Sequence, residues 1–94
     1  MSHDALVHEN VDDVAVVIHD VAAGETVRAV NLDGHEVAVL EAVEAVPLGH
    51  KIALRAMPAE HHVIKYGRTI GRATSDIARG AHVHIQNVKS IRWA

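Results

Sequence analysis

The sequence contains no cysteine and no phenylalanine, and it has only one tryptophan and one tyrosine among 94 residues. Without cysteine, neither disulfides nor thiolate metal ligands can contribute, which fits a reducing cytoplasm. Without large aromatic side chains, the apolar half of the composition consists chiefly of valine, alanine, isoleucine and leucine. Small and β-branched side chains pack well on pleated surfaces, so we predict an all-β fold.

Long apolar runs and a strong positive charge are also missing. No apolar stretch approaches the roughly 20 residues that a membrane-spanning helix requires, and the N-terminal residues lack the pattern of a secretory leader. The formal net charge of −3 argues against nucleic acid as a partner, because phosphate binding relies on clustered lysine and arginine. We therefore expect a soluble, cytoplasmic protein that binds neither a membrane nor nucleic acid.

The chain is long enough for one small domain. We predict a flexible lead-in over residues 1–11 and a single domain over residues 12–94. Arg28 is the one basic residue before Pro47, and all the other lysines and arginines follow it. This asymmetry suits a small anion or an acidic partner surface, but a solvated basic face explains the charge equally well.

Short apolar runs between turn residues predict strands. The predicted strands are 14–18, 26–30, the first half of 35–46, 51–55, 63–66 and 81–88. Thr74, Ser75 and Asp76 offer capping side chains for a single helical turn, which Gly80 would end. The sequence shows no internal repeat and no strand-helix-strand unit, which favours a compact barrel-like or clip-like β fold.

Histidine is frequent, with nine in the chain, and imidazole serves as acid, base or metal ligand near neutral pH. His82 and His84 lie two residues apart on the last predicted strand, so both could offer a nitrogen to one divalent metal. A third nitrogen or a carboxylate is not evident nearby, because Glu60 and Asp76 must be brought in by folding. A solvated histidine-rich face is the alternative, and we expect no metal bound by this chain alone.

Two pairs of neighbouring residues beside glycines could contribute to a binding site. His50 and Lys51 follow Gly49, and neighbours on a strand face opposite ways, so one of them can line a cleft while the other meets water. Lys65 and Tyr66 pose a similar alternative. Either Tyr66 is the one large ring in the core, with Lys65 at the surface, or its hydroxyl contacts a ligand; the core interpretation is favoured.

Several short motifs follow one another in a distinctive order. They are Asp12-Asp13-Val14, Ala23-Gly24-Glu25, Pro47…Gly49-His50-Lys51, Lys65-Tyr66-Gly67, Ile70-Gly71 and Val83-His84…Asn87. Over about residues 12–88 they resemble the small SAF-type domain of the altronate and galactarate dehydratase family, which also occurs as the small subunit of sulfolactate sulfo-lyase. Gln86 departs from the family pattern, which has histidine at this position.

The resemblance implies a β-clip fold and a lyase that eliminates water or sulfite from a hydroxy acid, with iron or another divalent metal. Removing a proton beside a carboxylate requires a base and stabilisation of a doubly negative enediolate. This sequence offers imidazoles and cations but no convincing metal cage. We therefore expect a small accessory subunit that completes an active site held mainly by a larger catalytic partner, which carries the metal.

Within this interpretation, His50 and His84 are the candidate catalytic residues, for proton transfer or substrate contact. The candidate substrate-binding residues can offer a cation, a hydroxyl or an amide to an anionic hydroxy acid: Lys51, Lys65, Tyr66, Arg72 and Asn87. His82 and His84 are candidate metal ligands. The alternatives are a non-catalytic binding module for a small sugar acid or a protein partner, and a homo-oligomerisation domain.

Overall fold

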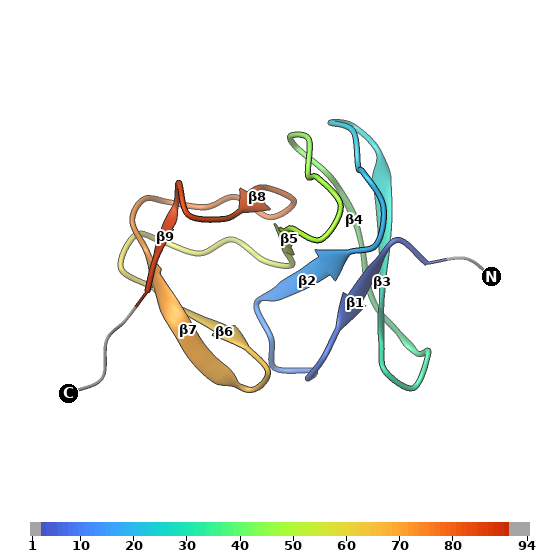
Figure 1. Ribbon diagram of the computed structural model, residues 1–94, viewed down its shortest axis with the longest axis horizontal. Coiled ribbons are helices and arrows are strands. Elements are labelled where there is room, and N and C mark those ends of the chain that lie inside the picture. The colour runs from blue at the N-terminus through green and yellow to red at the C-terminus, as the bar shows by residue number, and fades with distance from the viewer. Residues whose placement is uncertain (1–2, 91–94) are drawn as a thin grey trace.

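The computed structural model describes residues 3–90, which form strands and turns without a helix. The strands are β1 (Ala5–Val7), β2 (Val14–Val17), β3 (Thr26–Asn31), β4 (Glu36–Glu41), β5 (Lys51–Ala53), β6 (His62–Lys65), β7 (Arg68–Ala73), β8 (His82–Val83) and β9 (Val88–Lys89). A six-stranded sheet has the order β4-β3-β1-β2-β5-β8, and a three-stranded sheet has the order β6-β7-β9. Figure 1 shows the small sheet beside the curled large one. The all-β prediction is confirmed, and the described residues contain no helix suited to cross a membrane.

β1 lies inside the large sheet, between β2 and β3. It pairs antiparallel with β2 and parallel with β3, and the side chains of Ala5 and Val7 are fully buried. The predicted lead-in over residues 1–11 is therefore wrong for β1. Three residues are too few to show a hydrophobic period, and the strand is stabilised by partners that lie farther along the chain.

β2 and β5 separate two hydrophobic cores. In β2, Ala15 and Val17 face the first core and Val14 faces the second; in β5, Ile52 faces the first core and Ala53 the second. Side chains on a strand alternate between its faces, so a strand with cores on both sides has a continuous apolar sequence. This explains why residues 14–17 show no polar alternation.

Four turns share one geometry, in two pairs. Each turn follows a buried residue of an isolated β-bridge, and the bridges are Val21↔Val46 and Met57↔Ile77. In each turn the fourth residue's N–H donates to the first residue's carbonyl oxygen, and the third residue has a positive φ: Gly24, Gly49, Glu60 and Gly80. A positive φ at the third position is the geometry of a type II turn, which glycine adopts without strain.

These turns reveal an internal repeat that the sequence analysis missed. Asp-Val-Ala-Ala-Gly at 20–24 matches Asp-Ile-Ala-Arg-Gly at 76–80, and Val-Pro-Leu-Gly-His at 46–50 matches Met-Pro-Ala-Glu-His at 57–61. The aspartate that opens each first segment accepts a hydrogen bond from a backbone N–H in its matching turn, from Leu48 at 2.8 Å and from Ala59 at 2.9 Å.

The helical turn predicted near residues 74–78 does not form. The carboxylate of Asp76 accepts from Ala59 instead of capping its own segment, and Ile77 exchanges backbone hydrogen bonds with Met57. Tertiary pairing has therefore overridden a local capping signal.

The strand predicted over 81–88 is also interrupted, and β7 was not predicted. A turn separates β8 from β9, and Ile85 at this turn is 85% exposed. The side chain of Asn87 holds the turn, because its Oδ1 accepts from the His84 N–H at 3.0 Å and its Nδ2 donates to the His82 carbonyl at 2.7 Å. The Asn87 side chain therefore fixes the backbone at both His82 and His84.

Candidate functional site

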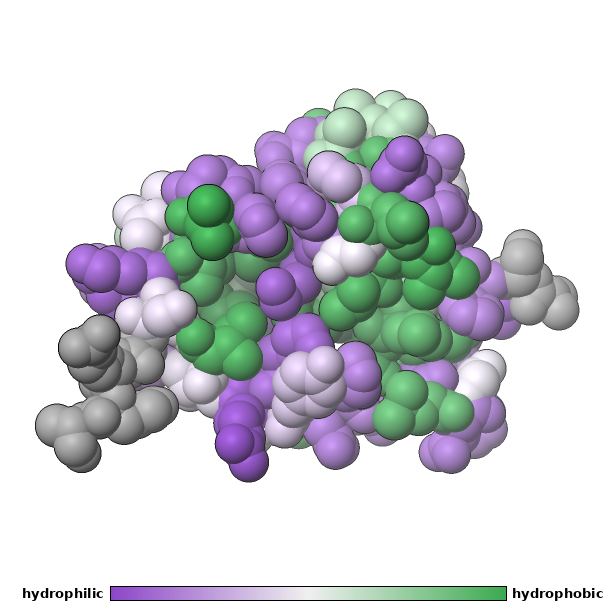
Figure 2. Space-filling model, viewed as in Figure 1, coloured by the Kyte–Doolittle hydropathy of each residue, from purple (hydrophilic) through white to green (hydrophobic). Residues whose placement is uncertain are grey.

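A cleft of about 600 Å³ lies between the two sheets. Val16 and Lys51 line it from the large sheet, Lys65 and Ile70 from the small sheet, and His84 from the turn after β8. Its volume is within the range of small-molecule binding sites. Figure 2 shows this face of the molecule, where hydrophobic patches flank a hollow with hydrophilic surface.

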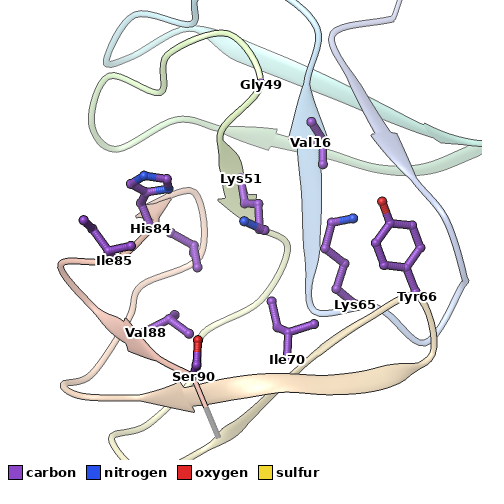
Figure 3. A pocket seen from close by; sticks show the side chains of 11 residues that line it. Val16, Gly49, Lys51, Lys65, Tyr66, Ile70, His84, Ile85, Val88 and Ser90 are labelled. Carbon is purple, nitrogen blue, oxygen red and sulfur yellow. The ribbon is translucent and has the colours of Figure 1, made fainter. Parts of the chain in front are cut away.

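Two lysines supply the positive charge of the cleft. Lys51 begins β5 and Lys65 ends β6, and Figure 3 shows their side chains among those that line the cleft, with the Lys65 amino group beside the Tyr66 ring. Within residues 3–90, neither amino group lies within ion-pair distance of a carboxylate. Charged groups in partly dehydrated sites need compensation, so a bound anion would be stabilised here.

The favoured prediction placed Tyr66 in the core and Lys65 at the surface, and the structure shows the opposite. Lys65 is only 6% exposed, whereas Tyr66 is 55% exposed and its ring forms part of the cleft wall. The core interpretation of Tyr66 is therefore wrong. Tyr66 has a positive φ of 57° in the turn after β6, which directs its ring outward, and the Lys65 Nζ lies 3.3 Å from the ring centroid in a cation–π contact.

Three histidines form a cluster beside the cleft, and the pairing of β5 with β8 explains why. Lys51 is opposite Val83 and Ile52 is opposite His82, so the same antiparallel register places His50 opposite His84. The His50 and His84 ring centroids are 4.1 Å apart, and His50 Nδ1 lies 2.8 Å from His82 Nε2. His50 is thus the third nitrogen donor, which the sequence analysis did not find.

The surroundings favour the neutral form of two of these imidazoles. Burial lowers the pKa of His82, and the neighbouring His50 lowers it further. Desolvation also lowers the pKa of His84, with smaller contributions from His50 and Lys51. A neutral imidazole has a free lone pair, so His82 and His84 are available near neutral pH as proton acceptors or metal ligands.

The other candidate residues have different surroundings. Arg72 forms an ion pair with Glu60 at 3.1 Å and is not among the residues that line the cleft. Asn87 holds the turn that carries His84, as described above. The structure thus brings Lys51, Lys65, Tyr66 and His84 together around the cleft, and the His50 ring stacks against His84. The functional roles of all these residues remain predictions.

Two buried carboxylates position the lysine side of the cleft. Asp12 is fully buried, and its side chain accepts from the backbone N–H groups of Tyr66 at 3.1 Å and Gly67 at 2.9 Å. Asp13 accepts from the Ile64 N–H and from His61, both at 2.9 Å. Neither acid was predicted to have a positioning role, although two acids directly before a buried apolar run were a signal.

The fold and the site define a small all-β domain that presents a cationic cleft beside a histidine cluster. The chain belongs to the family of altronate/galactarate dehydratase SAF domains, whose model matches residues 3–91. This confirms the family resemblance inferred from the motifs.

Individual relatives fall into two kinds. The chain is 40% identical over 94 residues to (2R)-sulfolactate sulfo-lyase subunit alpha of Chromohalobacter salexigens, a match that covers 99% of this chain and 100% of that protein. It is 48% identical over 48 residues to the subunit alpha of Paracoccus pantotrophus, covering 51% and 72%. It is 45% identical over 42 residues to altronate dehydratase of Bacillus subtilis, covering 45% of this chain but only 8% of that enzyme.

Proposed function

We propose that this chain is the small subunit of a hydroxy-acid lyase, of the sulfolactate sulfo-lyase or altronate/galactarate dehydratase type. The end-to-end match with a sulfo-lyase subunit alpha supports a separate small subunit. A protein named as one subunit works with another, so this chain completes an active site that a larger catalytic chain mainly holds. This larger chain also holds a divalent metal, and the family resemblance implies that the metal is iron.

The observation that carries the proposal is the pair of lysines that line the cleft and have no carboxylate partner in the described residues. Lys51 and Lys65 come from different sheets and line the same cleft. Charge-assisted hydrogen bonds from two such groups bind the carboxylate of a small hydroxy acid. The hydrophobic side chains of Val16 and Ile70 line the same cleft and strengthen these bonds by excluding water.

His84 is the residue of the histidine cluster that lines the cleft, so it contacts the bound hydroxy acid. Elimination removes the proton next to the carboxylate and releases the leaving group from the neighbouring carbon, while negative charge builds on the carboxylate oxygens. The two lysines stabilise that charge, and a divalent metal supplies further stabilisation when bound. His50 and His84 contribute proton transfer or substrate contact.

The lysines can be tested by kinetics of the chain assembled with its large subunit. Lys51→Ala and Lys65→Ala should each raise KM by about tenfold or more, because each removes a charge-assisted hydrogen bond to the substrate. Lys89→Ala is the matched control, since Lys89 is exposed on β9 and does not line the cleft. Unchanged KM in both cleft variants, with folding and assembly intact, would remove the lysines from the binding site.

A binding module without catalysis is the second candidate, and the described chain favours it in one respect. The cleft is formed by this chain's own residues, so an anion could bind without a partner. Calorimetric titration of the chain alone with sulfolactate and with galactarate separates the two functions. Tight binding by the isolated chain, together with no large subunit in native co-purification, favours the module.

A further inference from the structure

We propose that His50, His82 and His84 form a site for one divalent transition-metal ion on this chain. One ring nitrogen from each residue lies within 4.8 Å of the other two. The three side chains come from two segments that are more than thirty residues apart in sequence and are brought together by the β5–β8 pairing. This inference replaces the expectation that the chain binds no metal by itself.

The donor set suits the borderline metals. Three imidazoles without a thiolate match the preference of Zn²⁺, Fe²⁺, Ni²⁺ and Cu²⁺ rather than that of Mg²⁺ or Ca²⁺, which prefer oxygen ligands. Three protein ligands leave a coordination position free, as in catalytic zinc sites. Because His84 also lines the cleft, the site lies at the edge of the space that the two lysines face.

The spacing of the nitrogens is close to what one ion requires. Two nitrogens bound to the same Zn²⁺ lie roughly 3–3.5 Å apart, given bond lengths of about 2.0–2.1 Å. His50 Nδ1 and His82 Nε2 are already 2.8 Å apart, sharing a proton that an ion would replace. His84 is only partly buried, so rotation of its side chain can bring its nitrogen to the same point.

Neighbouring side chains support the cluster as outer-shell groups do in metal sites. The Gln86 side-chain nitrogen Nε2 lies 3.1 Å from His82 Nδ1 and 3.4 Å from the His82 carbonyl oxygen. A 180° turn of this amide about its Cγ–Cδ bond would present its oxygen to Nδ1–H and would leave the lone pair of Nε2 for the metal. Asn87 fixes the backbone at both His82 and His84, so two of the three ligands are held by one turn.

The charges around the cluster have opposite signs. Lys51 lies close enough to His84 to disfavour a further positive charge there, whereas Glu44 favours positive charge at His82. The carboxylate therefore offsets part of the repulsion between the lysine and a cation.

Calorimetric titration of the full chain with Zn²⁺ at pH 7.5 tests the site directly. We expect one ion per chain, and we expect each of His50→Ala, His82→Ala and His84→Ala to weaken binding by about tenfold or more. His35→Ala is the matched control, because His35 is exposed and lies in the loop between β3 and β4. Its Kd should equal that of the wild type.

Imidazole NMR spectra of the wild-type chain keep the test independent of any folding defect in the variants. At one equivalent of Zn²⁺, the ring resonances of the three clustered histidines should shift, and those of His35 should not. No binding by the wild type, or shifts confined to other histidines, would overturn the proposal, as would wild-type affinity in the three variants. Such a failure leaves the kinetic test of Lys51 and Lys65 untouched, since that test measures substrate binding.

Discussion

At the scale of single residues, buried carboxylates determine where the lysines of the cleft lie. Asp12 and Asp13 accept hydrogen bonds from backbone groups on both sides of Lys65, at Ile64 and at Tyr66. Both acids directly precede β2, so they attach the β6–β7 hairpin to the large sheet. A buried carboxylate with several N–H donors is well compensated, and these two hold the Lys65 side chain against the cleft rather than in water.

His84→Ala is the sharpest single change on the histidine side. In the assembled lyase we expect turnover to fall by about tenfold or more, because the variant removes either a metal ligand or a proton-transfer group. The domain should stay folded, since His84 is only partly buried. Measured kcat and a circular dichroism spectrum check both points, and normal turnover would exclude His84 from catalysis.

At the scale of strands and turns, the sequence predicted what local pattern can encode. Five predicted strands correspond to β2, β3, β4, β5 and β6, because apolar β-branched runs bounded by turn residues are a local signal. The pairing of β5 with β8 is not local. Without its register, nothing placed His50 opposite His84, and the cluster appeared to have two nitrogens instead of three.

The lysine cleft could be predicted only in part, because local sequence pattern again encodes some of its features and not others. The motif residues Lys51 and Lys65 could be selected by charge and by neighbouring glycines. The local pattern does not tell whether Lys65 or Tyr66 faces inward. That choice depends on the positive φ of Tyr66 and on the buried Asp12, whose carboxylate accepts a hydrogen bond from the Tyr66 N–H. Alternation along a strand gives opposite faces but does not say which face is buried.

Substitution of Gly80 tests why glycine is needed at the third position of its turn. A Cβ at Gly80 would collide with the Glu41 backbone carbonyl, and φ is +86°, whereas Gly24 has a similar φ of +88° and open space around it. We expect Gly80→Ala to lower the free energy of unfolding by about 3 kcal/mol or more, and Gly24→Ala by about 1 kcal/mol. Urea denaturation measures both. Equal losses would mean that only the backbone conformation, and not the close approach of this turn to the end of β4, makes glycine necessary at position 80.

At the scale of the whole molecule, the cleft depends on two cores that share strands. β2 and β5 contribute side chains to both cores, and the cleft lies between the two sheets that these cores support. Loss of either core would expose one face of β2, so neither sheet can remain intact when the other unfolds. The two sheets should therefore behave as one cooperative unit.

Native-state hydrogen exchange can test this coupling with a substitution in one core and a probe in the other. Val17→Ala truncates a fully buried side chain of the first core and should cost about 2 kcal/mol. The opening free energy of the Ala73 amide should fall by the same amount, although this amide donates to the His61 carbonyl next to the small sheet. Val39→Ala, the same change at an exposed position, should leave that amide's protection nearly unchanged. An Ala73 amide that exchanges as slowly in Val17→Ala as in the wild type would show that the small sheet opens independently of the first core.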